Sequence, residues 1–449
     1  MVIKFLGAAG MVTGSSYILT STSGESIMVD CGMFQGIPET EKFNYEPIDA
    51  DVSKLIGVVL THAHLDHCGR LPMLIKGGYD KSIWMTPPTA EITNISLYDT
   101  ARINSDKNHV ELYSDDDVEK TISLFKTIGY NEPFSIGPFK ILLHDDGHII
   151  GSASVEIVDT SSPESLQKIV FSGDLGNSPA DLIKPTEMLS SADVVVIEST
   201  YGDRLHPNEN PEDKVRDEIN EIEKNGGVLL IPAFSIERSQ ELLHMISHLK
   251  MSGRVKNDTE VVFDGPMGAK VTAVFEKYRG YYNQELTDDL KKSDPFHFPG
   301  LTNVMNYRSS KKEVAENTPK VVIAGSGMMS GGRIMEYAAR FLPVASTRLL
   351  FVGYQAAGTI GRQILEGATS VHINGEEIPV NATISETQAM SSHADQTGLL
   401  NWLRSMKGVK KVIVTHGEDD ARQVFAEKIK KDLGITDVAI PTLNEEIIL

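Results

Sequence analysis

The chain has 449 residues, of which 41% are hydrophobic and 23% charged, ordinary values for a globular protein of one large domain or several smaller ones. Its 42 basic and 62 acidic residues give a formal net charge of −20. This balance argues against a protein that coats nucleic acid non-specifically, because that binding needs a broad basic surface. It leaves room for local positive charge from metal ions and a few arginines.

Two further exclusions follow from the sequence. No apolar stretch approaches the roughly 20 residues that a membrane helix needs. The two cysteines, Cys31 and Cys68, cannot form a disulfide framework, which fits a reducing compartment. We therefore expect a cytoplasmic protein without a membrane partner.

Short strand-like runs separated by glycine-rich turns open the chain, at residues 3–6, 15–19 and 26–29. Such a pattern predicts a β-meander. The apolar run 55–60 that follows shows little alternation, which is typical of a buried parallel strand.

Directly after this run, three imidazoles and one carboxylate fall within six positions: His62, His64, Asp66 and His67. Imidazole nitrogen and carboxylate oxygen are ligands that zinc and similar ions prefer. In open α/β folds, ligands bind at the carboxyl ends of the strands. A divalent metal site is therefore favoured over a solvated histidine-rich loop.

The same arrangement recurs along the chain, where apolar runs end abruptly in polar or glycine-rich residues. These runs end at residues 171, 197, 231, 323 and 414. Helical stretches such as 210–224 and 239–249 alternate with them, which predicts an α/β protein with largely parallel sheets.

Three more candidate ligands join the first cluster. His148 lies between glycines that permit a tight turn, and Asp174 and His416 each follow an apolar run. Taken singly, each could be a buried, hydrogen-bonded histidine or a turn aspartate. With the cluster they make seven potential ligands, too many for one tetrahedral ion and about right for two ions roughly 3.5–4 Å apart.

Residues 62–67 resemble the metal-binding signature of the metallo-β-lactamase superfamily, and His148 and Asp174 match its later ligand motifs. The resemblance implies an αββα sandwich with a dinuclear zinc site at one edge.

The second half resembles the β-CASP nucleases of this superfamily. Residues 198–202, 392–395 and 415–418 correspond to motifs A, B and C, in that order. The segments 232–241, 325–329 and 353–362 also look like that subfamily. Since the DNA-repair branch usually lacks a histidine in motif C, His416 favours RNA.

The resemblance implies a role for each site residue. One zinc would be held by His62, His64 and His148, the other by Asp66, His67 and His416, with Asp174 bridging. Asp66, Glu198 and His393 are the candidate catalytic residues. Glu198 and His393 would pair near the scissile phosphate, and His393 would protonate the leaving oxygen, since a nearby carboxylate keeps an imidazole charged.

We therefore expect a zinc-dependent ribonuclease with two Zn²⁺ per chain. Metal-bound hydroxide would attack phosphorus and leave a 5′-phosphate and a 3′-hydroxyl. Cleavage would be endonucleolytic, with room for 5′-to-3′ exonuclease activity. Two alternatives stay open: a metallo-hydrolase of a small ester, thioester or lactam, and a non-catalytic RNA-binding scaffold.

The expected partner is single-stranded RNA, and a homodimer fits the resemblance. Arg238, Arg333 and Arg362 are candidates to bind substrate phosphates, with intramolecular salt bridges as the alternative for each. The expected architecture is a metallo-β-lactamase domain in two parts, residues 1–204 and 370–449, around an inserted α/β β-CASP domain at residues 205–369.

Overall fold

The computed structural model describes residues 1–106, 111–161, 167–177, 182–292, 294–356 and 358–449. Residue 357, within the segment 353–362, lies outside the described residues. The chain forms two compact units, one of residues 1–205 with 392–449 and the other of residues 206–391.

The first unit contains two seven-stranded sheets. One sheet has the order β22 (Glu446–Ile448), β1 (Val2–Phe5), β2 (Tyr17–Thr20), β3 (Ser26–Val29), β4 (Leu55–Val59), β5 (Ile83–Met85) and β6 (Phe125–Thr127). The other has the order β21 (Asp437–Ala439), β20 (Lys411–Val414), β11 (Val194–Ile197), β10 (Gln167–Phe171), β9 (Ala153–Asp159), β8 (Phe139–Asp145) and β7 (Phe134–Ile136).

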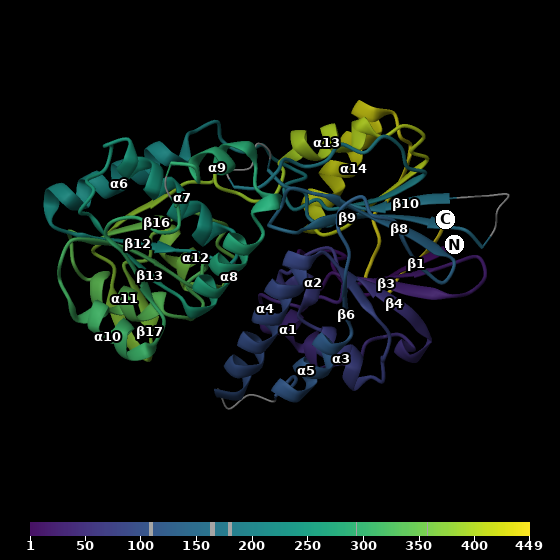
Figure 1. Cartoon of the computed structure of the whole chain (residues 1–449), viewed down its shortest axis with the longest axis horizontal. Helices are drawn as coiled ribbons and strands as arrows, with labels where there is room; N and C mark the ends of the chain where they lie inside the picture. Colours follow the sequence, from purple (N-terminus) through teal and green to yellow (C-terminus); the bar gives the residue numbers. More distant parts are fainter. Residues whose placement is uncertain (107–110, 162–166, 178–181, 293, 357) are drawn as a thin grey trace. The chain divides into compact units, whose positions relative to one another are not determined.

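The two sheets pack face to face through one core, which includes the fully buried Phe5 and Phe139. Helices cover both outer faces (Figure 1). The first sheet carries α2 (Leu65–Cys68), α3 (Leu71–Lys76), α4 (Pro87–Asp106) and α5 (Asp115–Ser123), and the second carries α13 (Gln396–Ser405) and α14 (Asp419–Leu433). The expected αββα sandwich is confirmed.

The second unit is built on a six-stranded sheet in which all neighbouring strands are parallel. Its order is β14 (Leu301–Val304), β13 (Glu260–Asp264), β15 (Lys320–Ala324), β12 (Val228–Pro232), β16 (Arg348–Phe351) and β19 (Thr383–Glu386). The central strands are buried throughout, as expected for a parallel sheet covered on both faces.

Helices lie on both sides of this sheet (Figure 1). They are α6 (Pro211–Asn225), α7 (Arg238–Met251), α8 (Pro266–Lys277), α9 (Gln284–Asp289), α10 (Tyr307–Ala315), α11 (Ile334–Phe341) and α12 (Ile360–Leu365). The hairpin of β17 (Ser370–Ile373) and β18 (Glu376–Pro379) shares one apolar core with α11, α12 and the sheet.

The inserted unit therefore extends further than the expected boundary at residue 369. Residues 370–391 belong to it, because β19 pairs with β16 at the edge of its sheet. The boundary expected at residue 204 lies beside the observed division after residue 205.

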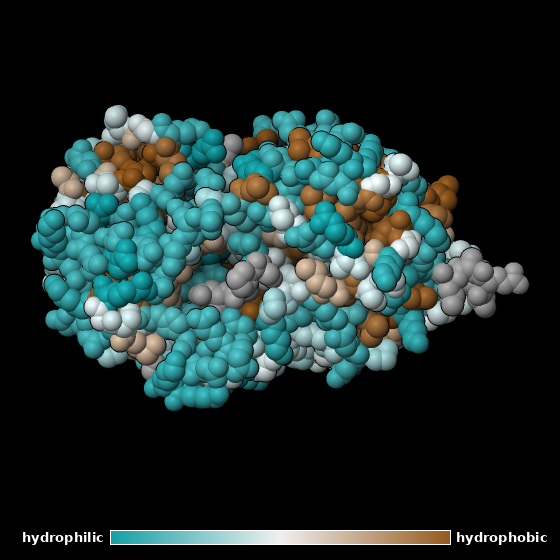
Figure 2. Space-filling view, turned by 90° about the horizontal axis from the view of Figure 1, so that it is seen from above, coloured by the Kyte–Doolittle hydropathy of each residue, from teal (hydrophilic) through white to brown (hydrophobic). Residues whose placement is uncertain are grey.

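Among the helices of the described residues, none combines the length and the apolar composition that a bilayer crossing requires. On the face seen in Figure 2, hydrophilic residues predominate and hydrophobic ones gather in separate patches.

The ring of Phe139 is a direct test of the core between the two sheets. Phe139→Ala should lower the free energy of unfolding by about 3–5 kcal/mol, because it removes a fully buried ring between close-packed sheets. Denaturant unfolding followed by circular dichroism measures the change. The control is Val424→Ala on α14, where the side chain is 47% exposed and the change should stay within about 0.5 kcal/mol. Equal effects in both variants would contradict this account of the core.

Candidate metal centre

Strand ends bring most of the candidate residues to one edge of the first unit. Asp174, Glu198 and His416 follow β10, β11 and β20, which are neighbours paired in parallel, so their carboxyl ends lie at the same edge. Residues 61–67 follow β4, and His148 lies in the turn between β8 and β9.

A first group consists of His62, His64, His148 and Asp174, whose ligand atoms all lie within 4.8 Å of one another. Nδ1 of His64 is 3.1 Å from Nε2 of His148. Nε2 of His62 is 3.5 Å from Oδ2 of Asp174. Ligand atoms on a tetrahedral zinc with bonds of about 2.0–2.1 Å lie roughly 3.3 Å apart, so these separations suit one ion.

Asp66, His67, Asp174 and His416 make a second group under the same limit. Nε2 of His67 is 3.3 Å from Oδ1 of Asp174, and Nε2 of His416 is 3.5 Å from Oδ2 of Asp66. These four residues also offer a donor set of two nitrogens and two oxygens.

Asp174 belongs to both groups, with Oδ2 toward the first and Oδ1 toward the second. It is 1% exposed, and no hydrogen bond of good geometry reaches either oxygen. Nε2 of His62 and Nε2 of His416 are likewise buried without a hydrogen bond. Leaving buried polar atoms unsatisfied is unfavourable, and cations between these atoms would satisfy them. The residues thus fit a metal centre.

The electrostatics agree with metal binding. Burial lowers the pKa of His62 and His148 well below the ordinary value, and that of His64 to about 4. These imidazoles are therefore neutral, with the lone pair that a ligand needs. Burial would also lower the pKa of His67, but the carboxylates of Asp174 and Asp30 raise it well above its usual range. The carboxylates of Asp174 and Asp30 favour a proton on His67. They would favour a metal cation for the same reason, and His67 would release that proton on binding one.

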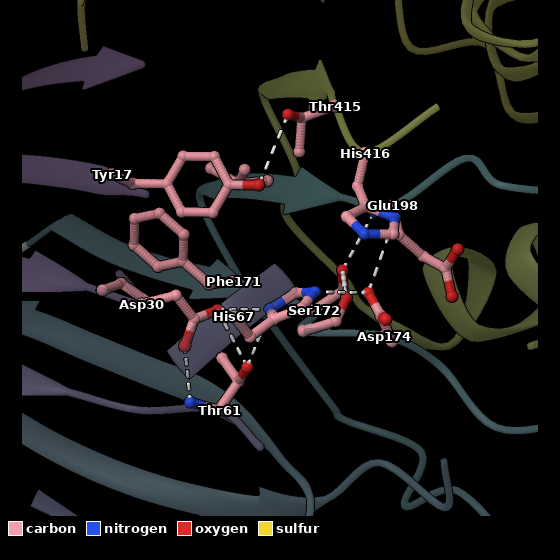
Figure 3. A pocket seen from close by; sticks show the side chains of 13 residues that line it. Tyr17, Asp30, Thr61, His67, Phe171, Ser172, Asp174, Glu198, Thr415 and His416 are labelled. Carbon is pink, nitrogen blue, oxygen red and sulfur yellow. Dashed lines mark hydrogen bonds and ion pairs between the residues drawn. The ribbon is translucent and has the colours of Figure 1, made fainter. Parts of the chain in front are cut away.

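Asp30 is a site residue that the sequence did not single out. Its Oδ2 accepts a hydrogen bond from Nδ1 of His67 at 2.8 Å, and the backbone N–H and hydroxyl of Thr61 donate to its two oxygens (Figure 3). This fixes His67 with Nε2 toward Asp174. The sequence feature that could have identified Asp30 is its position directly after β3, because β3 is the parallel neighbour of β4 and the two strands end at the same edge.

Two other candidate ligand imidazoles have a hydrogen-bond partner outside the two groups, although Nδ1 of His416 also lies 3.6 Å from Oδ1 of Asp174. Nδ1 of His148 donates to the carbonyl oxygen of Ser392 at 3.2 Å. Nδ1 of His416 lies 3.1 Å from the hydroxyl oxygen of Thr200. Such outer partners orient metal ligands and set their tautomers.

Glu198 and His393 lie together beside the two groups. Nδ1 of His393 is 3.2 Å from Oε1 of Glu198 and 3.9 Å from Oδ2 of Asp174. Backbone N–H groups of Leu175 and Thr200 also donate to Glu198. Burial would lower the pKa of His393, but the carboxylates of Glu198 and Asp174 outweigh it and raise the pKa to about 9. His393 is thus protonated at neutral pH.

The three candidate arginines all lie in the second unit, each near an acidic side chain. Arg238 is buried and pairs with Glu241. The guanidinium of Arg333 is 3.9 Å from Asp264 and 4.9 Å from the ring centre of Tyr307. The side chain of Arg362 is 44% exposed and pairs with Glu366 at 2.7 Å.

The sandwich and its histidine–aspartate edge define the class of protein, a metallo-hydrolase fold with a candidate metal centre. Three family descriptions match in chain order: "Metallo-beta-lactamase superfamily" at residues 9–193, "Beta-Casp domain" at 239–364 and "Zn-dependent metallo-hydrolase RNA specificity domain" at 377–441. The chain belongs to the metallo-β-lactamase superfamily and, within it, to the β-CASP ribonuclease family.

Similar proteins cover nearly the whole chain. Ribonuclease TTHA0252 of Thermus thermophilus is 35% identical over 92% of both chains. RNase aCSPSF2 of Saccharolobus solfataricus is 32% identical over 100% of this chain and 85% of its own. Transcription termination factor FttA of Methanocaldococcus jannaschii is 29% identical over 96% of this chain and 69% of its own.

A solved structure also has this fold. It is a protein of unknown function from Enterococcus faecalis V583, with a TM-score of 0.57 and 13% identity over 100% of this chain and 99% of its own. At this identity the likeness extends to the fold alone.

Asp30 offers a test of how the centre is held. Asp30→Ala should weaken divalent-metal binding about 10–100-fold, since His67 loses the partner that orients its ring. Competition with a chromophoric chelator measures the affinity, and circular dichroism checks the fold. Asp51→Ala removes an exposed carboxylate and should leave metal affinity unchanged. An unaltered affinity in Asp30→Ala would remove Asp30 from the site.

Proposed function

We propose that this chain is a zinc-dependent ribonuclease that hydrolyses phosphodiester bonds of single-stranded RNA, leaving 5′-phosphate and 3′-hydroxyl ends. The observation that carries the proposal is Asp174, whose two oxygens face two different ligand groups beside the Glu198–His393 pair. The family and the ribonucleases among its relatives support RNA as the substrate.

Two zinc ions per chain fit the seven ligands. His62, His64 and His148 would hold one, and Asp66, His67 and His416 the other, with Asp174 between them. Bound there, zinc supplies a water activated near neutral pH and positive charge for the phosphate oxygens. This also reconciles the net charge of −20 with an anionic substrate, since bound cations are the largest local charges in such a site.

The chain's own residues orient the reactants and move the protons. The side chain of Asp66 is 19% exposed, so its carboxylate can accept a hydrogen bond from the attacking water. Glu198 accepts a hydrogen bond from Nδ1 of His393, and Nε2–H of the same ring would protonate the departing 3′-oxygen. A general acid of this kind contributes roughly 10²–10⁴-fold to the rate.

Exposed aromatic side chains in the second unit favour a single-stranded polymer over a small ester or lactam. Phe234 and Tyr354 follow β12 and β16, which are parallel neighbours, and they are 42% and 46% exposed. Bases of a single strand stack on such rings. Of the candidate arginines, Arg362 is the most exposed and suits a phosphate contact.

The reaction belongs in a reducing compartment such as the cytoplasm, since both cysteines are buried and free. The homodimer expected from the resemblance stays a prediction.

Purified protein with zinc bound at both ligand groups should cut single-stranded RNA, and a zinc chelator should stop the reaction. RNAs labelled at either end, sampled over time, distinguish internal cleavage from 5′-to-3′ trimming and reveal the chemistry of the new ends. Metal content is measured on the same preparation by mass spectrometry. Fully metallated protein that leaves varied RNAs intact while hydrolysing a small ester or lactam would overturn the proposal. RNA binding without any cleavage would favour the scaffold alternative.

His393→Ala should keep the metal content of the unaltered chain while the cleavage rate falls by about 10²–10⁴-fold, because the general acid is lost. His372→Ala, which removes an exposed histidine of β17, serves as the matched control and should retain full activity. A fall in metal content in His393→Ala would contradict the assigned role. Cleavage of DNA as fast as RNA would contradict the preference inferred from His416.

A further inference from the structure

A second type of histidine–carboxylate cluster lies in the inserted unit. His244 and His248 are four positions apart on α7, so both side chains lie on the same face of the helix, one turn apart. Asp289 ends α9. The three ligand atoms lie within 4.8 Å of one another, and all three residues are separate from those of the metal centre described above.

The two imidazoles converge on one carboxylate oxygen. Nε2 of His244 is 3.4 Å from Oδ2 of Asp289, and Nε2 of His248 contacts the same atom. The ring centres are 4.2 Å apart. The other oxygen, Oδ1, is 3.2 Å from Nζ of Lys292. Oδ2 is therefore the oxygen that both rings share.

The separation between His244 and Asp289 suits ligands of one ion. A charge-assisted hydrogen bond would measure about 2.7–2.9 Å, whereas two ligand atoms on a tetrahedral zinc lie roughly 3.3 Å apart. The observed 3.4 Å between Nε2 of His244 and Oδ2 is close to the second value, whereas Nε2 of His248 lies within hydrogen-bond distance of the same oxygen and would have to move back to admit an ion. Two imidazoles and one carboxylate are also the protein ligands of many zinc sites with an open fourth position.

Burial and charge also suit a cation. His244 is 1% exposed and Asp289 7%, while the side chain of His248 is 24% exposed and gives the cluster a route to solvent. The carboxylate of Asp289 also pairs with Nζ of Lys292, a contact that favours the charged form that a metal ligand needs.

We propose that His244, His248 and Asp289 form an additional divalent-metal site that takes zinc or a similar ion such as cobalt(II). The ion would link α7 to α9 within the inserted unit, and a water would complete its coordination. The site is structural, so it does not depend on the cleavage reaction.

The test compares metal binding by the full chain and by His248→Ala, both stripped of metal and titrated with Co²⁺ alone. The unaltered chain should bind one equivalent more than the variant, and Zn²⁺ should raise its melting temperature by a larger increment. His372→Ala should behave as the unaltered chain. Equal binding and equal thermal shifts would overturn the proposal and leave the cluster as a hydrogen-bonded brace.

A second variant, His248→Cys, tests the site through a new absorption band and is informative even if His248→Ala folds poorly. His248→Cys should add a thiolate-to-cobalt charge-transfer band that the cobalt-loaded unaltered chain lacks, because neither of its own cysteines, Cys31 and Cys68, belongs to this cluster or to the two ligand groups. No new band in a folded His248→Cys chain would contradict the site. RNA cleavage should stay unchanged in both variants, so failure here and failure of the ribonuclease proposal give different results.

Discussion

The carboxylate of Asp174 connects the two ligand groups, and the rest of the candidate centre is arranged around it. Each oxygen faces a different set of imidazoles, so the spacing of the two groups is set by one side chain. That side chain follows β10, which is paired on both sides, with β9 and with β11. The sheet therefore holds the shared ligand in place before any ion binds, as preorganised metal sites require.

A layer of hydrogen-bond partners behind the ligands serves the same purpose. Asp30, Ser392 and Thr200 contact the Nδ1 atoms of His67, His148 and His416 and so help to fix the orientation of the three rings. Glu198 contacts Nδ1 of His393 in a similar way, and His393 lies outside the two ligand groups. The inserted unit differs: its parallel sheet presents polar and aromatic residues at strand ends, and among its described residues no run is as rich in histidine and aspartate as residues 62–67.

Sequence alone predicts the sandwich and the insertion through the family resemblance. It also names the candidate ligands that the structure brings together, because metal ligands are a few residue types and these follow recognisable apolar runs. It misses Asp30, since a lone aspartate after a short strand looks like any turn residue until β3 is known to pair with β4. It gives no reason to separate the arginines, although Arg238 is buried against Glu241 one turn along α7. It also ends the insertion early, because the pairing of β19 with β16 joins residues far apart in the chain. Long-range pairing is what local patterns do not encode.

The order of the ligands along the chain has a consequence for protein synthesis. Residues His62 to Asp174 precede the inserted unit, whereas His393 and His416 follow it. Asp174 and His393 are roughly 220 residues apart, on the order of 10–40 s of ribosomal elongation. During that interval the nascent chain lacks both His393 and His416. Any activity that needs these two side chains therefore arises only after the whole inserted unit has been synthesised.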